Sequence, residues 1–395
     1  MKKKLASLFF AIFLAPFCTV FACAEELDRK IDLKAIIFDP NTAVELPQDS
    51  EMTKIEEYKY KINEALKGEV SAVSTKGLLE DTMKIKIENG LIESISPWID
   101  YNGAFSNVWS SNEYKNTTYG INFADIGFNG KFKDKKTAFR LMFSPVRSIE
   151  GNTYFQSFFA DNYITRKIGK NNTILLGNTW VPNGIESKES PLFIPFFARS
   201  QIARTYGTSR ALGAKVMGDY SLAEYQFGGY SSGRFFKDFF PGPEFAGIVS
   251  IKPFGKTDGK WGKLLIGGSM DSGNADSHFF MAGSHLIYEY KRLKASFEYA
   301  TADGSNGSTG FSSNQSEGYY GTLAYRITPR IQTLLRYDHF DPNKNRANDI
   351  KTEYTTGINY FIKGQSLKLM LNFVYYTIEN GLYGSKIMAG GQFVL

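Results

Sequence analysis

Three arginines, Arg199, Arg204 and Arg210, lie in or beside one long connecting stretch, residues 180–209. A guanidinium group is always charged, and its planar fork of donors matches the oxygens of phosphate and carboxylate. The same stretch contains an apolar run at residues 192–197, which would be unfavourable in water by roughly 25 cal/mol per Å² of apolar surface. We therefore expect the stretch to fold inward against the protein and to bring the arginines to a narrow, solvent-filled passage.

These arginines have two possible roles, and the sequence leaves both open. They could pair with Glu186, Glu189 or other carboxylates and hold the stretch in place. They could also contact a passing anion, because a paired arginine still presents its outer edge.

Enzymatic chemistry has little support in the residue pattern. The three histidines, His278, His285 and His339, are seven or more residues apart, and none lies in a recognisable serine motif. The two cysteines, Cys18 and Cys23, both lie near the N-terminus. We expect no catalytic residue, no metal site and no cofactor.

Residues 1–24 have the pattern of a removed signal peptide. Lys2, Lys3 and Lys4 precede an apolar core at residues 5–21, and Ala22-Cys23-Ala24 is a suitable cleavage site. A lipoprotein site at Cys23 is a weaker alternative. Cleavage would remove both cysteines and reduce the formal net charge from +6 to +3, so binding to nucleic acid is not indicated.

Residues 25–95 form an N-terminal extension of different composition, rich in Lys and Glu. Residues 50–66 have apolar residues at helical spacing and predict a short amphipathic helix. Residues 83–88 alternate and predict a strand, followed by a turn at Asn89-Gly90. The extension could be a periplasmic spacer, a plug in a lumen, or an extra hairpin.

From residue 96 to residue 395, apolar and polar residues alternate in segments of about ten residues. The clearest is 366–376, where Leu367, Leu369, Leu371, Phe373 and Tyr375 share one face. A strand of a soluble sandwich could look the same. The 15% aromatic content and the recurrence of such segments instead favour an all-β fold, a transmembrane antiparallel β-barrel of about sixteen strands.

Connector lengths support a barrel. Short connectors such as 133–136, 218–219 and 291–292 alternate with long ones such as 106–118, 180–209 and 301–317. Tight periplasmic turns and long external loops are typical of outer-membrane barrels. The glycine-rich residues 303–310 are expected to be part of an external loop.

Strand phase places further charged residues inside the predicted barrel. Arg140, Arg326, Arg336 and Lys368 fall on inward positions, as do Glu224, Glu298 and Asp338, whereas His339 falls on an outward position. Inward charges of opposite sign usually pair across strands and hold the shape of a barrel. Together, inward cations would still raise the local potential and favour anions.

Several segments resemble the phosphate-selective porin O/P family. They are Leu176-Gly-Asn-Thr-Trp-Val-Pro-Asn-Gly-Ile-Glu186, Phe197-Ala-Arg-Ser200, Arg210-Ala-Leu-Gly213, Tyr337-Asp-His-Phe-Asp-Pro-Asn343, Tyr354-Thr-Thr-Gly-Ile-Asn-Tyr-Phe361 and the strand at 367–376. The resemblance covers most of residues 96–395. It implies a sixteen-stranded, usually trimeric outer-membrane channel with an inward-folded third loop and a cationic lumen that takes phosphate or related anions.

We therefore expect a porin in the outer membrane of a Gram-negative bacterium that allows passive diffusion of small anions such as phosphate. The expected partners are small inorganic or organic anions, outer-membrane lipid and lipopolysaccharide, and two further copies in a homotrimer. The candidate anion contacts are Arg199, Arg204, Arg210, Arg140, Arg326, Arg336 and Lys368. A general or carbohydrate-type porin, or a non-conducting structural or adhesive barrel, are the alternatives.

Overall fold

A computed structural model describes residues 84–145, 158–234, 239–257, 259–308 and 310–395. The expected signal peptide at residues 1–24 and the expected helix at residues 50–66 lie outside these residues.

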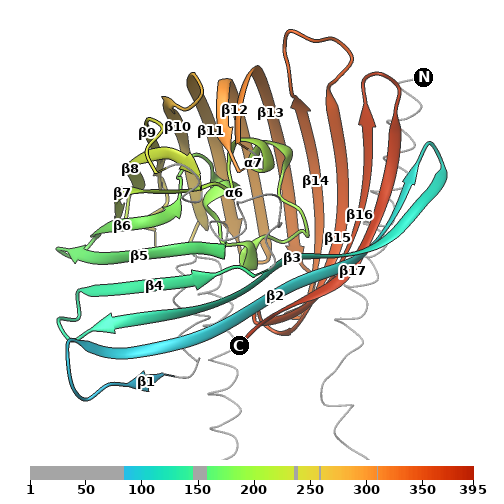
Figure 1. The fold of residues 1–395 in the computed structure, drawn as a ribbon. Helices are drawn as coiled ribbons and strands as arrows, with labels where there is room; N and C mark the ends of the chain where they lie inside the picture. Colours follow the sequence, from blue (N-terminus) through green and yellow to red (C-terminus); the bar gives the residue numbers. More distant parts are fainter. Residues whose placement is uncertain (1–83, 146–157, 235–238, 258, 309) are drawn as a thin grey trace, which may run out of the picture. The chain divides into compact units, whose positions relative to one another are not determined.

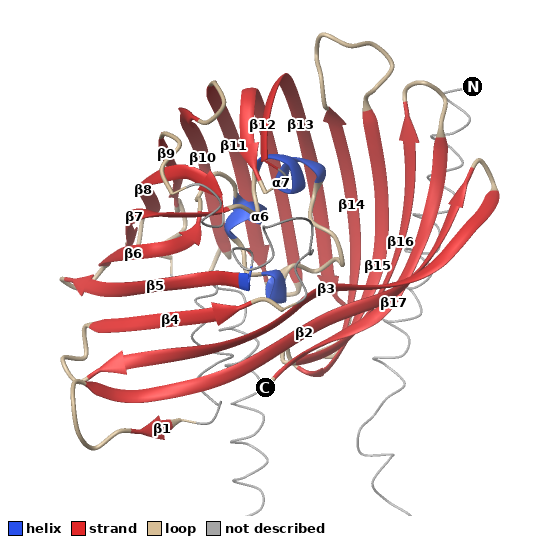
Figure 2. Ribbon diagram, in the orientation of Figure 1, coloured by secondary structure: helices blue, strands red, loops and turns tan. Residues whose placement is uncertain are grey.

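Sixteen antiparallel strands, β2 to β17, form a closed ring (Figures 1 and 2), as the sequence predicts. Each strand pairs with the next along the chain, and β17 pairs with β2 to close the ring. The strands are β2 (Ile92–Ser110), β3 (Glu113–Phe132), β4 (Thr137–Phe143), β5 (Phe159–Ile168), β6 (Asn172–Trp180), β7 (Arg210–Asp219), β8 (Ala223–Arg234), β9 (Pro243–Ile251), β10 (Lys263–Asn274), β11 (His278–Tyr290), β12 (Leu293–Gly307), β13 (Gly310–Arg326), β14 (Ile331–Asp341), β15 (Lys351–Lys363), β16 (Leu367–Ile378) and β17 (Tyr383–Val394).

A short additional strand, β1 (Ile85–Lys86), precedes the ring and pairs with the start of β2. The turn between them contains Gly90, whose φ of 87° is in the left-handed region that glycine adopts without strain. The predicted strand at residues 83–88 and its turn are thus present, with the strand shorter than predicted.

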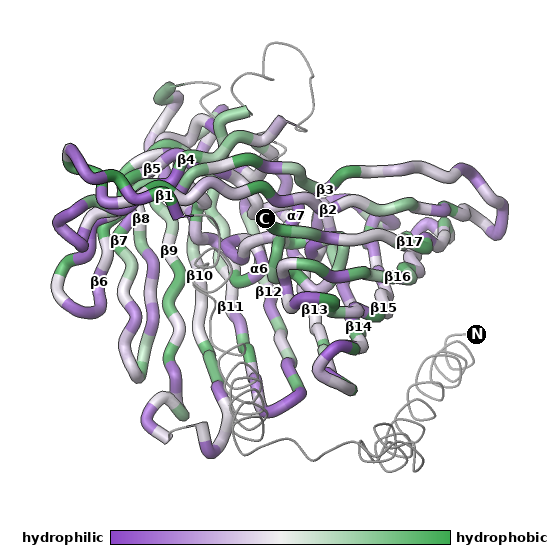
Figure 3. Tube along the Cα trace, turned by 90° about the horizontal axis from the view of Figure 1, so that it is seen from below, coloured by the Kyte–Doolittle hydropathy of each residue, from purple (hydrophilic) through white to green (hydrophobic). Residues whose placement is uncertain are grey.

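The alternation within each strand separates an outer apolar face from an inner polar one. On β16, Leu369 is 52% exposed, whereas its neighbour Lys368 is 1% exposed and faces the interior. Hydrophilic and hydrophobic residues also alternate along the individual strands in Figure 3. This pattern is that of strands between lipid and a polar lumen, and it confirms the phase predicted for residues 366–376.

Aromatic rings form a belt on the outer face of five neighbouring strands. Phe297 contacts Tyr319, Tyr319 contacts Tyr337, Tyr337 contacts Tyr354, and Tyr354 contacts Tyr375, with ring centroids 5.3–6.4 Å apart. Such belts lie at the membrane–water interfaces of outer-membrane barrels. His339 packs on Tyr319 in this belt, at 5.0 Å, as its predicted outward phase requires.

Two predicted external loops are wrong. Residues 106–118 continue β2 and β3, which are joined by Ser111 and Asn112 with φ values of 51° and 67°. Two consecutive residues with positive φ form the tight turn that matches the twist of a hairpin. Residues 301–317 likewise continue β12 and β13, so the glycine-rich segment is mostly strand and not loop.

The helices are short: α6 (Ile185–Lys188), the 3₁₀ helix η3 (Pro191–Phe193) and α7 (Gln201–Tyr206). Within the described ranges, no helix has the length and apolar character needed to cross a membrane.

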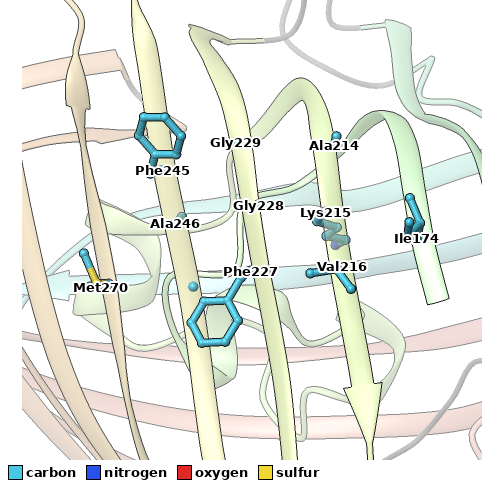
Figure 4. A pocket seen from close by; sticks show the side chains of 11 residues that line it. Ile174, Ala214, Lys215, Val216, Phe227, Gly228, Gly229, Phe245, Ala246 and Met270 are labelled. Carbon is cyan, nitrogen blue, oxygen red and sulfur yellow. The ribbon is translucent and has the colours of Figure 1, made fainter. Parts of the chain in front are cut away.

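A hollow of about 510 Å³ lies on the outer face of β6 to β10 (Figure 4). Its lining includes the small residues Ala214, Gly229 and Gly247 and the rings of Phe227 and Phe245, which are 45% and 63% exposed. This apolar hollow is therefore on the side of the wall that faces lipid, and not in the lumen.

Candidate functional site: an inward loop in the barrel

The connector between β6 and β7, residues 181–209, folds into the barrel and carries all three short helices (Figure 1). Ser200 begins α7, and its hydroxyl accepts a hydrogen bond from Ala203 N. Pro191 begins η3, where its fixed φ suits the first position of a helix. The predicted inward folding of this loop is confirmed.

Apolar side chains of the loop pack on the inner wall. Phe197 lies in a cluster with Ala104, Met370 and Met388, which belong to β2, β16 and β17. Phe196 packs with Ala324 and Leu334 on β13 and β14. Burial of these rings is the reason the loop does not extend into water.

Backbone N–H groups of the loop are satisfied by polar side chains of the wall. Ile185 N donates to Glu298 Oε1 at 2.8 Å, Phe197 N to Asn372 Oδ1 at 2.9 Å, and Gln201 N to Asp338 Oδ2 at 2.8 Å. Glu298 and Asp338 were expected to pair with cations across strands, but both accept hydrogen bonds from the loop, and Glu298 also accepts one from the Tyr320 hydroxyl. These inward carboxylates therefore fix the loop.

Arg199 holds the loop to itself. Its guanidinium donates to the carbonyl oxygens of Glu186 and Glu189 and lies 5.5 Å from the ring centre of Trp180. Burial lowers the pKa of Arg199 from its ordinary value, and burial raises the pKa of Glu189. An arginine bound to carbonyls keeps its full charge, because no carboxylate cancels it directly.

Arg204 is the most accessible of the three loop arginines. One of its nitrogens, Nη2, donates to both carboxylate oxygens of Glu353 on β15, at 2.9 and 2.8 Å. Its side chain remains 40% exposed. Arg204 therefore anchors α7 to the wall and also presents a free edge to solvent. It is compatible with both roles that the sequence left open, pairing with a carboxylate and contact with an anion.

Arg210 and Arg140 share the carboxylate of Asp161. Arg210 Nε lies 2.6 Å from Asp161 Oδ1, and Arg140 Nε lies 3.5 Å from Asp161 Oδ2. Each guanidinium also stacks on an indole, Arg210 on Trp180 at 3.9 Å and Arg140 on Trp98 at 4.3 Å. Arg210 is 1% exposed, so it supports the wall and is not at its surface.

Two of the three remaining candidates, Arg336 and Lys368, contact the loop. Arg336 donates to Ala198 O at 2.9 Å and lies 3.5 Å from Glu186, while Lys368 donates to Leu192 O at 3.1 Å. Arg326 stacks on Phe361 at 4.5 Å. The structure thus gathers Arg199, Arg204, Arg336 and Lys368 around one loop, and places Arg140 with Arg210 at Asp161.

The β12–β13 hairpin covers the base of the loop, which explains why residues 303–310 are not an external loop. Ser308 N donates to Gly207 O at 3.3 Å, and Thr208 and Ser308 share a hydrogen bond of 3.0 Å. Arg234 also donates to Asn306 O and pairs with Glu244 at 2.8 Å.

One histidine has a serine partner that the sequence did not reveal. His285 Nε2 and Ser250 Oγ are 2.9 Å apart on neighbouring inward positions of the wall. His285 Nδ1 has no hydrogen-bond partner among the residues that the structure describes and Ser250 is buried, so the pair there lacks the third group and the access that a nucleophilic serine needs. Among the described residues, no group of His, Cys, Asp and Glu could hold a metal ion.

Sequence reasoning missed the cations at the end of the barrel that has the short turns. Four lysines occupy inward phases near these turns, as the register of their strands with Arg140, Asp161 and Glu289 shows: Lys131, Lys167, Lys263 and Lys294. The signal was available, because the short connectors are rich in lysine. They had been treated only as turns.

Comparison with known proteins supports these features. Residues 268–379 match the family model described as phosphate-selective porin O and P. Comparison with curated proteins found no match.

Solved structures share the fold at low sequence identity. An anion-selective porin from Comamonas acidovorans has a TM-score of 0.55 at 13% identity, covering 76% of this chain and 99% of that one. The outer membrane channel DcaP of Acinetobacter baumannii has a TM-score of 0.55 at 11% identity, covering 79% and 99%. Salmonella typhi OmpF, in complex with daunomycin, has a TM-score of 0.54 at 11% identity, covering 79% and 100%.

Porins are channels and not enzymes, which agrees with the expectation that this chain carries no catalytic site. The match over residues 268–379 agrees with the resemblance to the phosphate-selective porin O and P family, and the closed sixteen-stranded ring with its inward loop has the fold of solved outer-membrane porins.

Proposed function

We propose that this porin allows passive diffusion of small anions, phosphate among them, through a lumen narrowed by the loop at residues 181–209. The observation that carries the proposal is the excess of cations on inward positions at the short-turn end. In bacterial barrels the short turns face the periplasm. A solute in the lumen would therefore pass a positive mouth on that side.

The charge at this mouth is accessible and only partly cancelled. Lys131 and Lys167 are exposed, and the side chain of Lys294 is 50% exposed although it lies 3.0 Å from Glu289. The inward carboxylates nearby, Glu224 and Glu289, are engaged by Lys252 and Lys294. A cleft lined by one sign of charge raises the local concentration of the opposite ion.

The loop adds positive charge at the constriction. Arg199 donates to neutral carbonyl oxygens, so its charge is not neutralised by a direct ion pair, and Arg204 keeps a 40% exposed side chain beside Glu353. Contacts of a passing anion with such groups are individually weak, which allows fast entry and release.

The comparison with known proteins also favours a preference for anions. The matched family is described as phosphate-selective, and one similar structure is an anion-selective porin. A homotrimer in contact with outer-membrane lipid and lipopolysaccharide is the proposed setting, in line with the resemblance.

Reversal potentials in a planar bilayer test this function. The purified chain is expected to give ohmic current in a KCl gradient with chloride more permeant than potassium, and added phosphate is expected to reduce the chloride current. Weakly selective current without block by phosphate would favour a general porin. An absence of current from correctly folded protein would favour a structural barrel.

Neutralising Arg204 is expected to reduce the anion preference more than neutralising Arg199. The side chain of Arg204 is 40% exposed, whereas Arg199 is turned into the loop. Reversal potentials of Arg204→Gln and Arg199→Gln provide the measurement. Equal values for both variants and the unmodified protein would remove these two arginines from the anion path.

A further inference from the structure

The inward loop is fastened near both of its α-helices by carboxylates of the wall. Four of them lie on inward positions of β10, β12, β14 and β15: Asp271, Glu298, Asp338 and Glu353. Asp271 Oδ2 accepts a hydrogen bond from Asn183 Nδ2 at 3.0 Å. The other three accept from Ile185, Gln201 and Arg204, respectively. The contacts therefore lie beside α6 and on α7.

A fifth carboxylate, Glu186, joins the two helices. It lies in α6, and its Oε2 accepts a hydrogen bond from Ser200 N at 2.5 Å, where α7 begins. Arg336 Nη1 of the wall lies 3.5 Å from Glu186 Oε1. Because Glu186 is 8% exposed, this link is shielded from solvent, and it fixes the position of α6 relative to α7.

Both helices take acceptors for their first N–H groups from the wall carboxylates. The first N–H groups of a helix have no partner within it. The N-cap of α6 is Gly184, which has no side chain, and Glu298 accepts from Ile185 N in its place. In α7, Asp338 accepts from Gln201 N. An ionised carboxylate accepts such a bond about twice as strongly as a neutral group, so the docking of both helices depends on the charge of the carboxylates.

The middle of the loop, residues 191–197, is held by groups that do not lose charge in acid. Phe197 N donates to Asn372 Oδ1 at 2.9 Å, and Gln392 Nε2 donates to Leu192 O at 3.1 Å. Side-chain amides do not titrate, and the apolar contacts of Phe197 do not depend on charge. Acid therefore leaves these contacts intact.

The charges around the carboxylates determine what acid would do. Their titratable and charged neighbours are Tyr230 and Arg234 on β8, Glu244 on β9, His285 on β11, Lys294 on β12, Tyr320 on β13, Arg336 on β14, Lys386 on β17, and Glu189, Arg199 and Arg204 in the loop. Arginine and lysine stay protonated in acid, whereas carboxylates become neutral at about pH 4. The loop and the wall would then both carry only positive charge at this contact, and like charges repel.

We propose that acid releases α6 and the start of α7 from the wall, while residues 191–197 stay docked. The loop then pivots on its middle, so the constriction widens as the pH falls. Ile202 and Tyr206 also pack in an apolar cluster on the wall, so α7 is expected to release less completely than α6. This inference concerns the position of the loop and does not depend on the anion preference.

Hydrogen–deuterium exchange of the full chain tests the release, at about pH 7 and at about pH 4, with rates corrected for the intrinsic dependence of amide exchange on pH. The amides of Ile185, Ser200 and Gln201, which donate to carboxylates, are expected to lose protection at the lower pH. The amide of Phe197, which donates to Asn372, is the control in the same loop and is expected to keep its protection. Loss of protection at all four amides, or at none of them, overturns the proposal.

A double variant, Glu298→Gln with Asp338→Asn, keeps the shape of both side chains and removes their charge. It is expected to show at neutral pH the exchange that the unmodified chain shows in acid. Glu317→Gln is the matched control, because Glu317 pairs with the exposed Lys344 at 2.8 Å, and it is expected to exchange like the unmodified chain. Full protection of the double variant at neutral pH would mean that the carboxylates do not hold the loop. If the double variant does not fold, the comparison of the unmodified chain at the two pH values decides alone.

Single-channel recording tests the widening. The conductance of the unmodified chain is expected to rise between neutral pH and about pH 4, and the double variant is expected to have the raised conductance already at neutral pH. A conductance that stays unchanged or falls in acid, while the barrel remains folded, overturns the widening of the constriction.

Discussion

A Phe197→Ala variant is expected to conduct more current per channel than the unmodified protein, with a noisier open level. Phe197 is 7% exposed and fills a cluster with Met370 and Met388 on the wall. Truncation of a buried phenylalanine to alanine costs about 3–5 kcal/mol. That cost falls on the docking of the loop, because the strand pairs of the ring do not involve Phe197. Single-channel recording measures the result.

Phe227→Ala is the control for this experiment. Phe227 is 45% exposed on the outer face and lines the hollow of β6 to β10, so its truncation changes ring volume without touching the loop. Its conductance is expected to stay at the level of the unmodified protein. If the conductance of Phe197→Ala also equals that of the unmodified protein, while the folded barrel forms in normal yield, the loop does not narrow the lumen at Phe197.

The ring itself could be predicted from the sequence because its signal is local. Leu367, Leu369 and Leu371 alternate with polar residues, and the period of two fixes which face each residue occupies. The predicted number of about sixteen strands matches the ring, and the predicted strand at 366–376 is β16. Inward positions of Arg140, Arg336 and Lys368 followed from the same phase and are confirmed.

Hairpin ends were harder to predict. The segments at 106–118 and 301–317 are rich in Ser, Asn and Gly, a composition shared by loops and by tight hairpins. At Ser111-Asn112 the deciding factor is a pair of positive φ angles. At 301–317 it is contact of Ser308 with Gly207 of the inward loop, which is distant in sequence.

The partners of the candidate arginines could not be read from spacing either. Pairing of the loop arginines with the carboxylates of Glu186 or Glu189 was one of two roles left open, and Arg199 binds the backbone carbonyls of those two residues instead. Only the folded loop decides which oxygen of a residue points toward a guanidinium. The choice matters for function, because a carbonyl leaves the positive charge of Arg199 uncancelled whereas a carboxylate would neutralise it.

The second large effect is expected from the mouth at the short-turn end. A triple variant, Lys131→Gln, Lys167→Gln and Lys294→Gln, is expected to lower the ratio of anion to cation permeability severalfold, since local charge in a cleft changes counter-ion concentration by about tenfold or more. All three side chains lie on inward phases and are exposed, so the change removes positive charge from the lumen, together with the ion pair between Lys294 and Glu289. The reversal potential in a KCl gradient measures it.

Ionic strength and a matched triple variant make this result specific. At about 0.1 M salt the screening length is about 10 Å, so the change in reversal potential caused by the triple variant is expected to shrink as salt is raised. Lys115→Gln, Lys344→Gln and Arg346→Gln remove the same charge from exposed residues at the opposite end, where Lys115 and Lys344 pair with Glu113 and Glu317. A smaller shift is expected for this control set. Equal shifts for both triple variants would mean that net charge, and not the lysines of the short-turn mouth, sets the selectivity of the channel.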